Sequence, residues 1–311
     1  MSNEKDEMTT PNMSNDVAFK SILIATDFSE ASLKAQRHAI SIARHFHAKF
    51  YMAHIVSSVG LNMAGADALE LETKVTSREM AELERNLVQD GRLAGLSHEF
   101  IVRQGDICEE LEDIIREHHV EIVVIGTQGR RGIEKLVMGS VAEKIFREAD
   151  KLVLTVGPHS KPDAPLEGSD GTRPFLFPTN FSEASKKALP HAISFCNHFG
   201  ARLLLLHVAP ASRATTPGSI LGEQEIARRE LLARLHGFLP SDVPLSVTPE
   251  FMVEFGDHGE QILNAARLRK ADLIVMGLDH SKHGRAVSHL PMTTTYRVVC
   301  QAPCSVLTVR N

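Results

Sequence analysis

A long internal repeat constrains the fold of this chain more than any other feature of the sequence. TDFSEASLKAQRHAISIARHF at 26–46 returns as TNFSEASKKALPHAISFCNHF at 179–199. Shorter matches follow in the same order, with AHIV returning as LHVA and EIVVIG returning as DLIVMG. Repetition of a whole structural unit means that both halves fold by the same rules. The 311 residues are therefore expected to form two copies of one domain of ordinary size.

Within each copy, short apolar runs alternate with longer segments of helical spacing. In the first copy, strands are expected at 20–25, 49–56, 98–103, 122–125 and 152–156, and helices at 30–46, 68–93, 107–118 and from 140. This alternation is typical of βαβ units and a parallel sheet. The predicted fold class is α/β, with two tandem, open, five-stranded parallel sheets that carry helices on both faces, as in Rossmann-like folds. The helix at 68–93 has an expected core stripe of Leu69, Val75, Met80, Leu83 and Leu87.

Changes in composition suggest the domain boundaries. Residues 1–18 are polar and mixed in charge, and we expect them to be disordered. Residues 158–172 are rich in Pro, Gly, Ser and Asp without periodicity, which is typical of a linker. The predicted domains therefore span 19–157 and 173–311.

Composition argues against several classes of function. A net charge of −5 and a pI near 6.3 disfavour a nucleic-acid binder, and no apolar run is long enough to predict a membrane span. The N-terminus lacks the apolar core of a signal peptide. Four dispersed cysteines without a CxxC pair fit buried thiols in a reducing cytoplasm. The sixteen histidines show no HExxH or Cys/His spacing, so no metal site is predicted.

One stretch of the first copy, EIVVIGTQGRRGIEKLVMGSVAE at 121–143, has the features of an anion-binding site. A buried strand ends at Gly126, Gly129 follows, and Gly139-Ser140 precedes a predicted helix. The spacing of Ser140 and Glu143 is that of a capping box, so Ser140 is the expected N-cap. Backbone N–H groups and the helix dipole at such a terminus favour anionic groups, and we expect it to hold nucleotide phosphates.

The turn TDFS, which begins at Thr26, is expected to face the same crevice, because ligands bind at the carboxyl ends of strands where the strand order reverses. The second copy changes this chemistry and keeps the scaffold. Asp27 becomes Asn180, Gly129 becomes His280, and Gly139-Ser140 becomes Met292-Thr293 after Pro291. Proline has no N–H and methionine is bulky, so both oppose close approach of a phosphate to the backbone.

These residues make the chain similar to tandem-domain members of the universal stress protein family. The family's nucleotide motif is glycine, two residues, glycine, nine residues, glycine, then Ser or Thr, and Gly126, Gly129, Gly139 and Ser140 match it. The similarity covers about 19–157 and 173–310. It implies a fold like that of adenine-nucleotide α-hydrolases and a stress-response regulatory protein that binds ATP, with Mg²⁺ on the phosphates.

The resemblance also implies a set of nucleotide-binding residues. At the adenosine end these are Ala25, Thr26, Asp27 and Ile55, and at the ribose and phosphate end Ile125, Gly126, Gly129, Gly139, Ser140 and Val141. Ala25 departs from the family, which often has proline there, as the second copy does at Pro178. Arg130, inside the loop, either contacts a phosphate or is solvated surface charge.

Several of these residues also have a purely structural interpretation. Asp27 could be only a turn residue, and Gly126 could be partly structural because Gly277 persists in the second copy. Ser29 is expected to be an N-cap in any case. His38 and its counterpart His191 are expected to belong to the scaffold.

Three functions remain open from the sequence. The leading interpretation is an ATP-binding regulator with nucleotide in the first domain only and no catalytic residues, because no Walker lysine or paired carboxylate is present. The alternatives are a slow ATPase or autophosphorylating enzyme with Ser140 or a nearby hydroxyl as acceptor, and an interaction module without a ligand.

The repeat also predicts assembly. The two last strands, 152–156 and 306–309, are apolar edges that should pair across a pseudo-twofold axis. A homodimer of the whole chain and an unidentified protein partner are further expectations.

Overall fold

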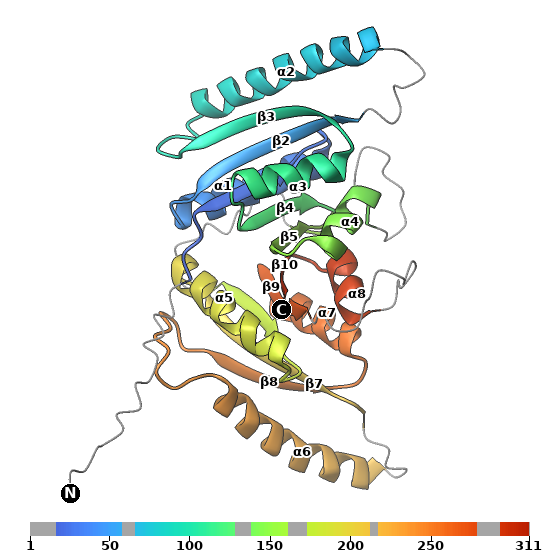
Figure 1. The fold of residues 1–311 in the computed structure, drawn as a ribbon. Coiled ribbons are helices and arrows are strands. Elements are labelled where there is room, and N and C mark those ends of the chain that lie inside the picture. Colours follow the sequence, from blue (N-terminus) through green and yellow to red (C-terminus); the bar gives the residue numbers. More distant parts are fainter. Residues whose placement is uncertain are drawn as a thin grey trace, which may run out of the picture.

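The structure is a computed structural model that describes residues 17–57, 66–127, 138–160, 173–211, 217–278 and 293–310. The first unit contains β1 (Ser21–Ala25), α1 (Glu30–His45), β2 (Lys49–Ser57), α2 (Ala66–Gln89), β3 (His98–Gly105), α3 (Ile107–Glu117), β4 (Ile122–Gly126), α4 (Ser140–Glu148) and β5 (Leu152–Val156). The second contains β6 (Pro174–Pro178), α5 (Glu183–Phe199), β7 (Arg202–Ala209), α6 (Pro217–Phe238), β8 (Glu250–Phe255), α7 (His258–Leu268), β9 (Leu273–Leu278), α8 (Thr294–Gln301) and β10 (Ser305–Arg310). Figure 1 shows the first unit in blue to green and the second in yellow to red.

The strands of both units form one ten-stranded sheet, in the order β3-β2-β1-β4-β5-β10-β9-β6-β7-β8. All pairings within a unit are parallel, and β5 pairs with β10 in antiparallel fashion, with Leu154 opposite Leu307. The predicted pairing of the two last strands is confirmed. The two expected five-stranded parallel sheets are joined edge to edge at this junction. The buried Thr155 and Thr308 hydroxyls each donate 3.1 Å to a carbonyl of the opposite strand, which stabilises the junction further.

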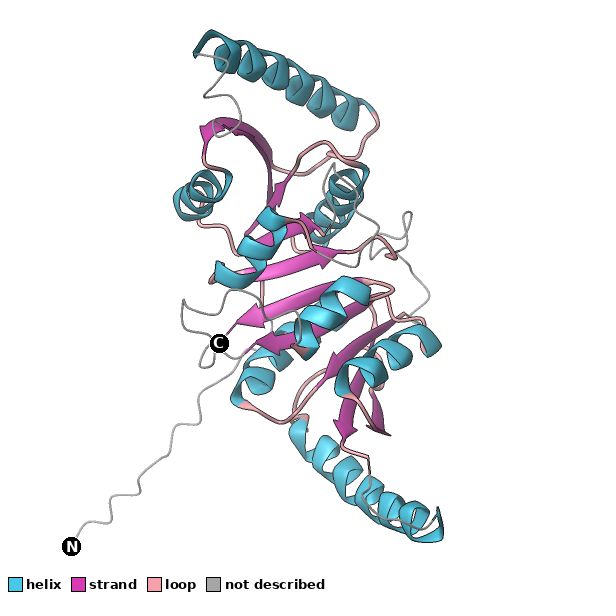
Figure 2. Ribbon diagram, turned by 90° about the vertical axis from the view of Figure 1, so that its right-hand side faces the viewer, coloured by secondary structure: helices cyan, strands magenta, loops and turns pink. Residues whose placement is uncertain are grey.

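Two apolar cores cover the two faces of this sheet. Ile22 and Ile24 of β1 point into one core and Leu23 into the other, as the alternation of side chains along a strand requires. Helices α1, α2, α5 and α6 contribute to the core on the first face, and α3, α4, α7 and α8 to the core on the second. Figure 2 shows helices on both faces of the sheet. Each core runs through both units, so the two domains share their packing as well as their sheet.

The expected core stripe of α2 was wrong at one position. Met80 and Leu87 are buried, but the Val75 side chain is 45% exposed. Seven residues span nearly two helical turns and return to the same face, whereas five residues separate Val75 from Met80 by about 140°. The predicted core stripe therefore combined residues from two different faces of α2.

Candidate functional site

The strand order reverses between β1 and β4, and the turn after β1 is held rigidly there. The Thr26 N–H donates to the Ala53 carbonyl at 2.9 Å, and His54 Nδ1 donates to the Thr26 carbonyl at 2.7 Å. Phe28 has a φ of 58°, and its N–H donates to Thr26 Oγ1 at 3.1 Å. The second domain repeats the histidine bond from His207 at 2.8 Å. The turn is therefore part of the common scaffold.

Asp27 has a turn-forming role that does not need its charge. The Ser29 N–H donates to Asp27 Oδ1 at 3.0 Å, and in the second domain the Ser182 N–H donates to Asn180 Oδ1 at 3.1 Å. An amide oxygen thus closes the same turn as a carboxylate oxygen. Ser29 caps α1, as predicted, by accepting from the Ser32 N–H at 3.2 Å.

Gly126 allows β4 and α1 to approach closely. A Cβ at Gly126 would lie 3.0 Å from backbone atoms of Ala31, and one at Gly277 would lie 2.3 Å from the carbonyl oxygen of Ala184. Ordinary van der Waals contact for such an atom begins near 3.4 Å. Both glycines therefore have a packing role in their domains, whether or not a ligand is present.

The predicted capping box at the start of α4 is wrong. The N-cap is Gly139, and Ser140 is the exposed first residue of the helix. Glu143 pairs with Arg147 one turn along at 2.7 Å instead of reaching back to the cap. The helix itself begins at Ser140, as expected. The Gly139 N–H donates to the Thr127 carbonyl at 3.0 Å. Thr127 was missed in the sequence, where only its place after Gly126 could have indicated it.

The two domains therefore begin the corresponding helix differently. Gly139 has no side chain with which to cap α4, and the first N–H groups of a helix have no acceptor within it. In α8 the N-cap is Thr293, whose hydroxyl accepts from the Tyr296 N–H at 3.3 Å. The first backbone N–H groups of α4 therefore have no side-chain cap, whereas the Thr293 hydroxyl satisfies one of the corresponding N–H groups of α8.

The apolar members of the predicted site lie on one face of the sheet. Ile55 and Ile125 are buried in the core beneath α3 and α4, and Ala25 and Val141 pack against the same core, partly exposed. The structure thus brings Ala25, Thr26, Asp27, Ile55, Ile125, Gly126, Gly139, Ser140 and Val141 to the carboxyl ends of β1, β2 and β4 and the start of α4. Gly129, Arg130 and His280 lie outside the described residues.

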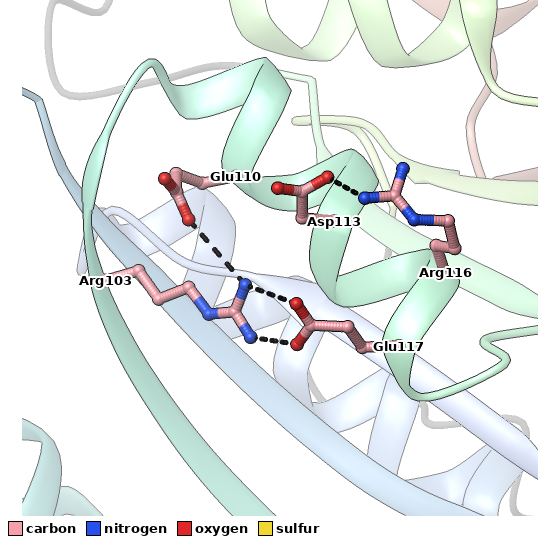
Figure 3. Close-up of polar contacts among 5 residues, drawn as sticks. All are labelled: Arg103, Glu110, Asp113, Arg116 and Glu117. Atoms are coloured by element: carbon pink, nitrogen blue, oxygen red, sulfur yellow. Dashed lines mark hydrogen bonds and ion pairs between the residues drawn. The ribbon is translucent and has the colours of Figure 1, made fainter.

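A cluster of charged side chains in the first domain lies away from the carboxyl ends of β1 and β4. Arg103 on β3 pairs with Glu117 and lies 3.7 Å from Glu110, while Asp113 pairs with Arg116 (Figure 3). Strand β2 separates β3 from β1 and β4. This guanidinium is directed at carboxylates of α3, so the cluster is a surface ion-pair network of small energetic weight.

The described residues contain no group of three or more His, Cys, Asp or Glu side chains arranged to hold a metal ion. Their helices include none that is both long and apolar enough to cross a membrane.

Comparison with known proteins follows the same division of the chain into two units. The family model described as the universal stress protein family matches twice, at residues 18–157 and 171–310. The chain belongs to the universal stress protein family. A universal stress protein of Mycolicibacterium smegmatis is 28% identical over 93% of this chain and 96% of its own length. One from Methanocaldococcus jannaschii is 31% identical over 44% of this chain and 82% of its own length.

A solved structure supports the same architecture. The crystal structure of a universal stress protein from Archaeoglobus fulgidus matches 96% of this chain and 99% of its own, with a TM-score of 0.65 and 18% identity. At that identity the likeness concerns the fold alone. The arrangement of two such units in one chain is therefore found in that solved structure as well.

Proposed function

We propose that this universal stress protein binds one molecule of ATP per chain, at the carboxyl ends of β1 and β4 in the first domain, and acts as a nucleotide-dependent regulator. In this proposal residues 19–157 form the domain with the intact nucleotide motif, and residues 173–311 form the degenerate copy. Asp27 accepts hydrogen bonds from the adenosine, and Ala25, Ile55 and Ile125 provide its apolar surroundings. Gly126, Gly129, Gly139, Ser140 and Val141 surround the ribose and phosphates, with Arg130 and Mg²⁺ as further phosphate partners.

The difference between the two helix starts carries this proposal. Because Gly139 has no side chain, a phosphate can approach the backbone of the first turn of α4, and the N–H groups of that turn have no side-chain cap. In α8 the Thr293 hydroxyl caps the helix. Uncapped N–H groups and the positive end of the helix dipole favour phosphate. The substitution of Met292-Thr293 for Gly139-Ser140 removes this arrangement from the second copy.

The replacement of Asp27 by Asn180 in the second copy also supports nucleotide binding in the first domain only. Because Asn180 closes the same turn in the second domain, a carboxylate is not required for the fold there. Its negative charge is suited to accept hydrogen bonds from the exocyclic amine or ribose hydroxyls of an adenosine.

The decisive experiment is to denature the purified protein and identify the nucleotide released, together with calorimetric titration of the nucleotide-free protein. We expect about one adenine nucleotide per chain, since one of two sites is proposed to be intact. Release of two, or no binding of millimolar ATP with Mg²⁺, would contradict the proposal. Cyclic AMP belongs in the titration because another universal stress protein was solved in complex with cAMP.

A matched pair of variants tests the role of Asp27. Asp27→Asn should weaken ATP binding by about tenfold or more, the loss of a charge-assisted hydrogen bond, while unfolding stability changes by less than about 0.5 kcal/mol. Asn180→Asp is the control and should change neither. Hydrolysis of ATP by the wild type that is lost in Gly139→Ala would instead favour the slow ATPase.

A further inference from the structure

Helix α4, which begins the proposed phosphate site of the first domain, is capped at its other end by the second domain. The last backbone bond of this helix runs from the Ala149 N–H to the Ile145 carbonyl at 3.0 Å. The Phe146 carbonyl lies one position further on, among the carbonyls for which a helix has no internal donor. The Arg310 guanidinium of β10 donates to this carbonyl. A side chain of the second domain therefore completes a helix of the first.

The register of the sheet accounts for this contact. Antiparallel pairing places Thr308 opposite Val153, so Arg310 lies beside the connection between α4 and β5. Along β10, Leu307 and Val309 point into one core and Val306 into the core to which α4 contributes. Because side chains alternate along a strand, Arg310 points to the same face as Val306, which is the face that carries α4.

The first domain does not return this contact. The repeat aligns Val156 with Val309, which places Gly157 at the position of Arg310. Gly157 does lie at the C-terminal end of α8, because a Cβ there would be 3.9 Å from the carbonyl oxygen of Ala302, the C-cap of that helix. Glycine has no side chain that could donate to a helix carbonyl, so Gly157 supplies no equivalent cap to α8.

The Arg310 side chain is costly to bury. Its Nε is buried and has no hydrogen-bond partner among the described residues. Burial lowers the pKa of the guanidinium, and the negative charge of Glu148 opposes this shift. A buried charge with an unpaired N–H adds little net stability, and a well-packed apolar side chain of similar size is often as stable. Packing of the domain junction alone therefore does not account for an arginine at this position.

The two ends of α4 are close enough to act on each other through the order of the helix. It has nine residues and is about 13 Å long, and a helix this short is not stable by itself in water. A phosphate at its N-terminus and a cation at its C-terminus stabilise the same ordered helix through its dipole. Loss of Arg310 would favour fraying and reduce the fraction of molecules in which the N–H groups of the first turn are aligned.

We propose that Arg310 is a positioning residue, through which the degenerate second domain holds α4 in the ordered geometry that binds phosphate in the first domain. This inference rests on the proposed function. It gives the copy without an intact motif a role in nucleotide binding. Linkage then requires bound ATP to stabilise the contact of Arg310 with α4 in turn.

The first test compares ligands with and without phosphate. Arg310→Met should weaken ATP binding about fivefold, the lower end of the coupling between distinct sites, and should change adenosine binding less than about twofold. The midpoint of urea unfolding should move little, because the variant removes an unpaired buried N–H together with the cap. Equal weakening of ATP and adenosine, or none, would overturn the positioning role.

Arg44→Met is the matched control. The Arg44 guanidinium also donates to backbone carbonyls, those of Gly91 at 2.8 Å and Arg92 at 2.6 Å, but these follow α2 and not α4. This variant should leave the ratio of ATP affinity to adenosine affinity unchanged. Arg310→Lys keeps a positive charge and donors at the end of α4 and should bind ATP more tightly than Arg310→Met. No recovery in the lysine variant would contradict a role for this cation.

The second test does not depend on a ligand. Hydrogen exchange of the apo protein should show amides of 143–149 exchanging about fivefold faster in Arg310→Met than in the wild type or Arg44→Met, the worth of one hydrogen bond. Unchanged exchange would overturn the positioning role even if ATP binds. Faster exchange in a protein that binds no nucleotide would refute the proposed function and leave the mechanical contact established.

Discussion

Substitution of Gly126 by alanine tests whether this glycine is needed for packing, for ligand binding or for both. The same substitution at its counterpart Gly277, in the second domain, is the comparison. At Gly126 an added methyl group would meet the Ala31 carbonyl carbon and oxygen, each at 3.0 Å, and at Gly277 it would meet the Ala184 oxygen at 2.3 Å. The atoms approached are backbone of α1 and α5, so relief requires a helix to move away from the sheet. Neither glycine has a positive φ, so the cost arises from the contact alone.

The expected destabilisation follows from the size of these overlaps. A shortfall of a few tenths of an ångström at Gly126 should cost about 1–2 kcal/mol, within the range for overpacking of a dense core. The larger shortfall at Gly277 should cost about 3 kcal/mol or more, since α5 must retreat by roughly 1 Å. Urea unfolding followed by circular dichroism measures both, compared as midpoints at constant slope.

Two results would refute this reasoning. Equal destabilisation by Gly126→Ala and Gly277→Ala would show that the backbone contacts do not set the cost. If Gly126→Ala kept full stability and lost ATP binding, Gly126 would be a ligand residue only. We expect Gly126→Ala to lose stability, and to lose affinity as well because its neighbour Thr127 holds Gly139.

Two further predictions concern pH and capping. Burial lowers the pKa of His38 from 6.5 to about 4, so below pH 6.5 the unfolded chain takes up the proton first and stability falls until about pH 4. The part of the loss due to His38, measured by urea unfolding across this range, should be roughly 3 kcal/mol, so His38→Gln should lose about that much less than the wild type. A smaller loss remains in the variant because burial also lowers the pKa values of His191 and His207. An unchanged pH profile in His38→Gln would contradict the assignment. Thr293→Ala should lower the free energy of unfolding by about 1 kcal/mol through loss of the α8 cap, whereas Ser140→Ala should lower it by almost nothing because Ser140 caps no helix. Equal losses in the two variants, measured by urea unfolding, would show that Ser140 does cap α4.

Sequence reasoning recovered the parts of the fold that depend on local pattern. The strands and helices of the first copy followed from apolar runs and spacing, with shifts of a few residues at the ends, as in α2 at Ala66–Gln89. The pairing of β5 with β10 was also predicted, because two apolar edges of a repeated unit need partners. The cap at Ser29 was anticipated from residue type alone.

The parts that were missed depend on contacts between distant residues. Ser140 looked like a cap because Glu143 stands three residues later, yet the bond from Gly139 to Thr127 decides where the loop ends. The hydrogen bond from the Arg310 guanidinium to the Phe146 carbonyl joins residues of different domains, and no local sequence pattern predicts it. Such contacts depend on the antiparallel pairing of β5 with β10, which joins the two domains.

The duplicated domain also allows structural and ligand roles to be separated without reference to other proteins. Where both copies have the same residue, the contact it makes is found in both: a serine caps the first helix, a histidine holds the turn after the first strand, and a glycine admits the helix. Where the copies differ, the fold is kept by other means, as when Asn180 closes the turn of Asp27 and Thr293 caps α8. Among the described residues of the proposed site, Asp27, Gly139 and Ser140 are particular to the first copy, and they lie at the end of β1 and the start of α4. A ligand at that place accounts for both the position and the type of these residues.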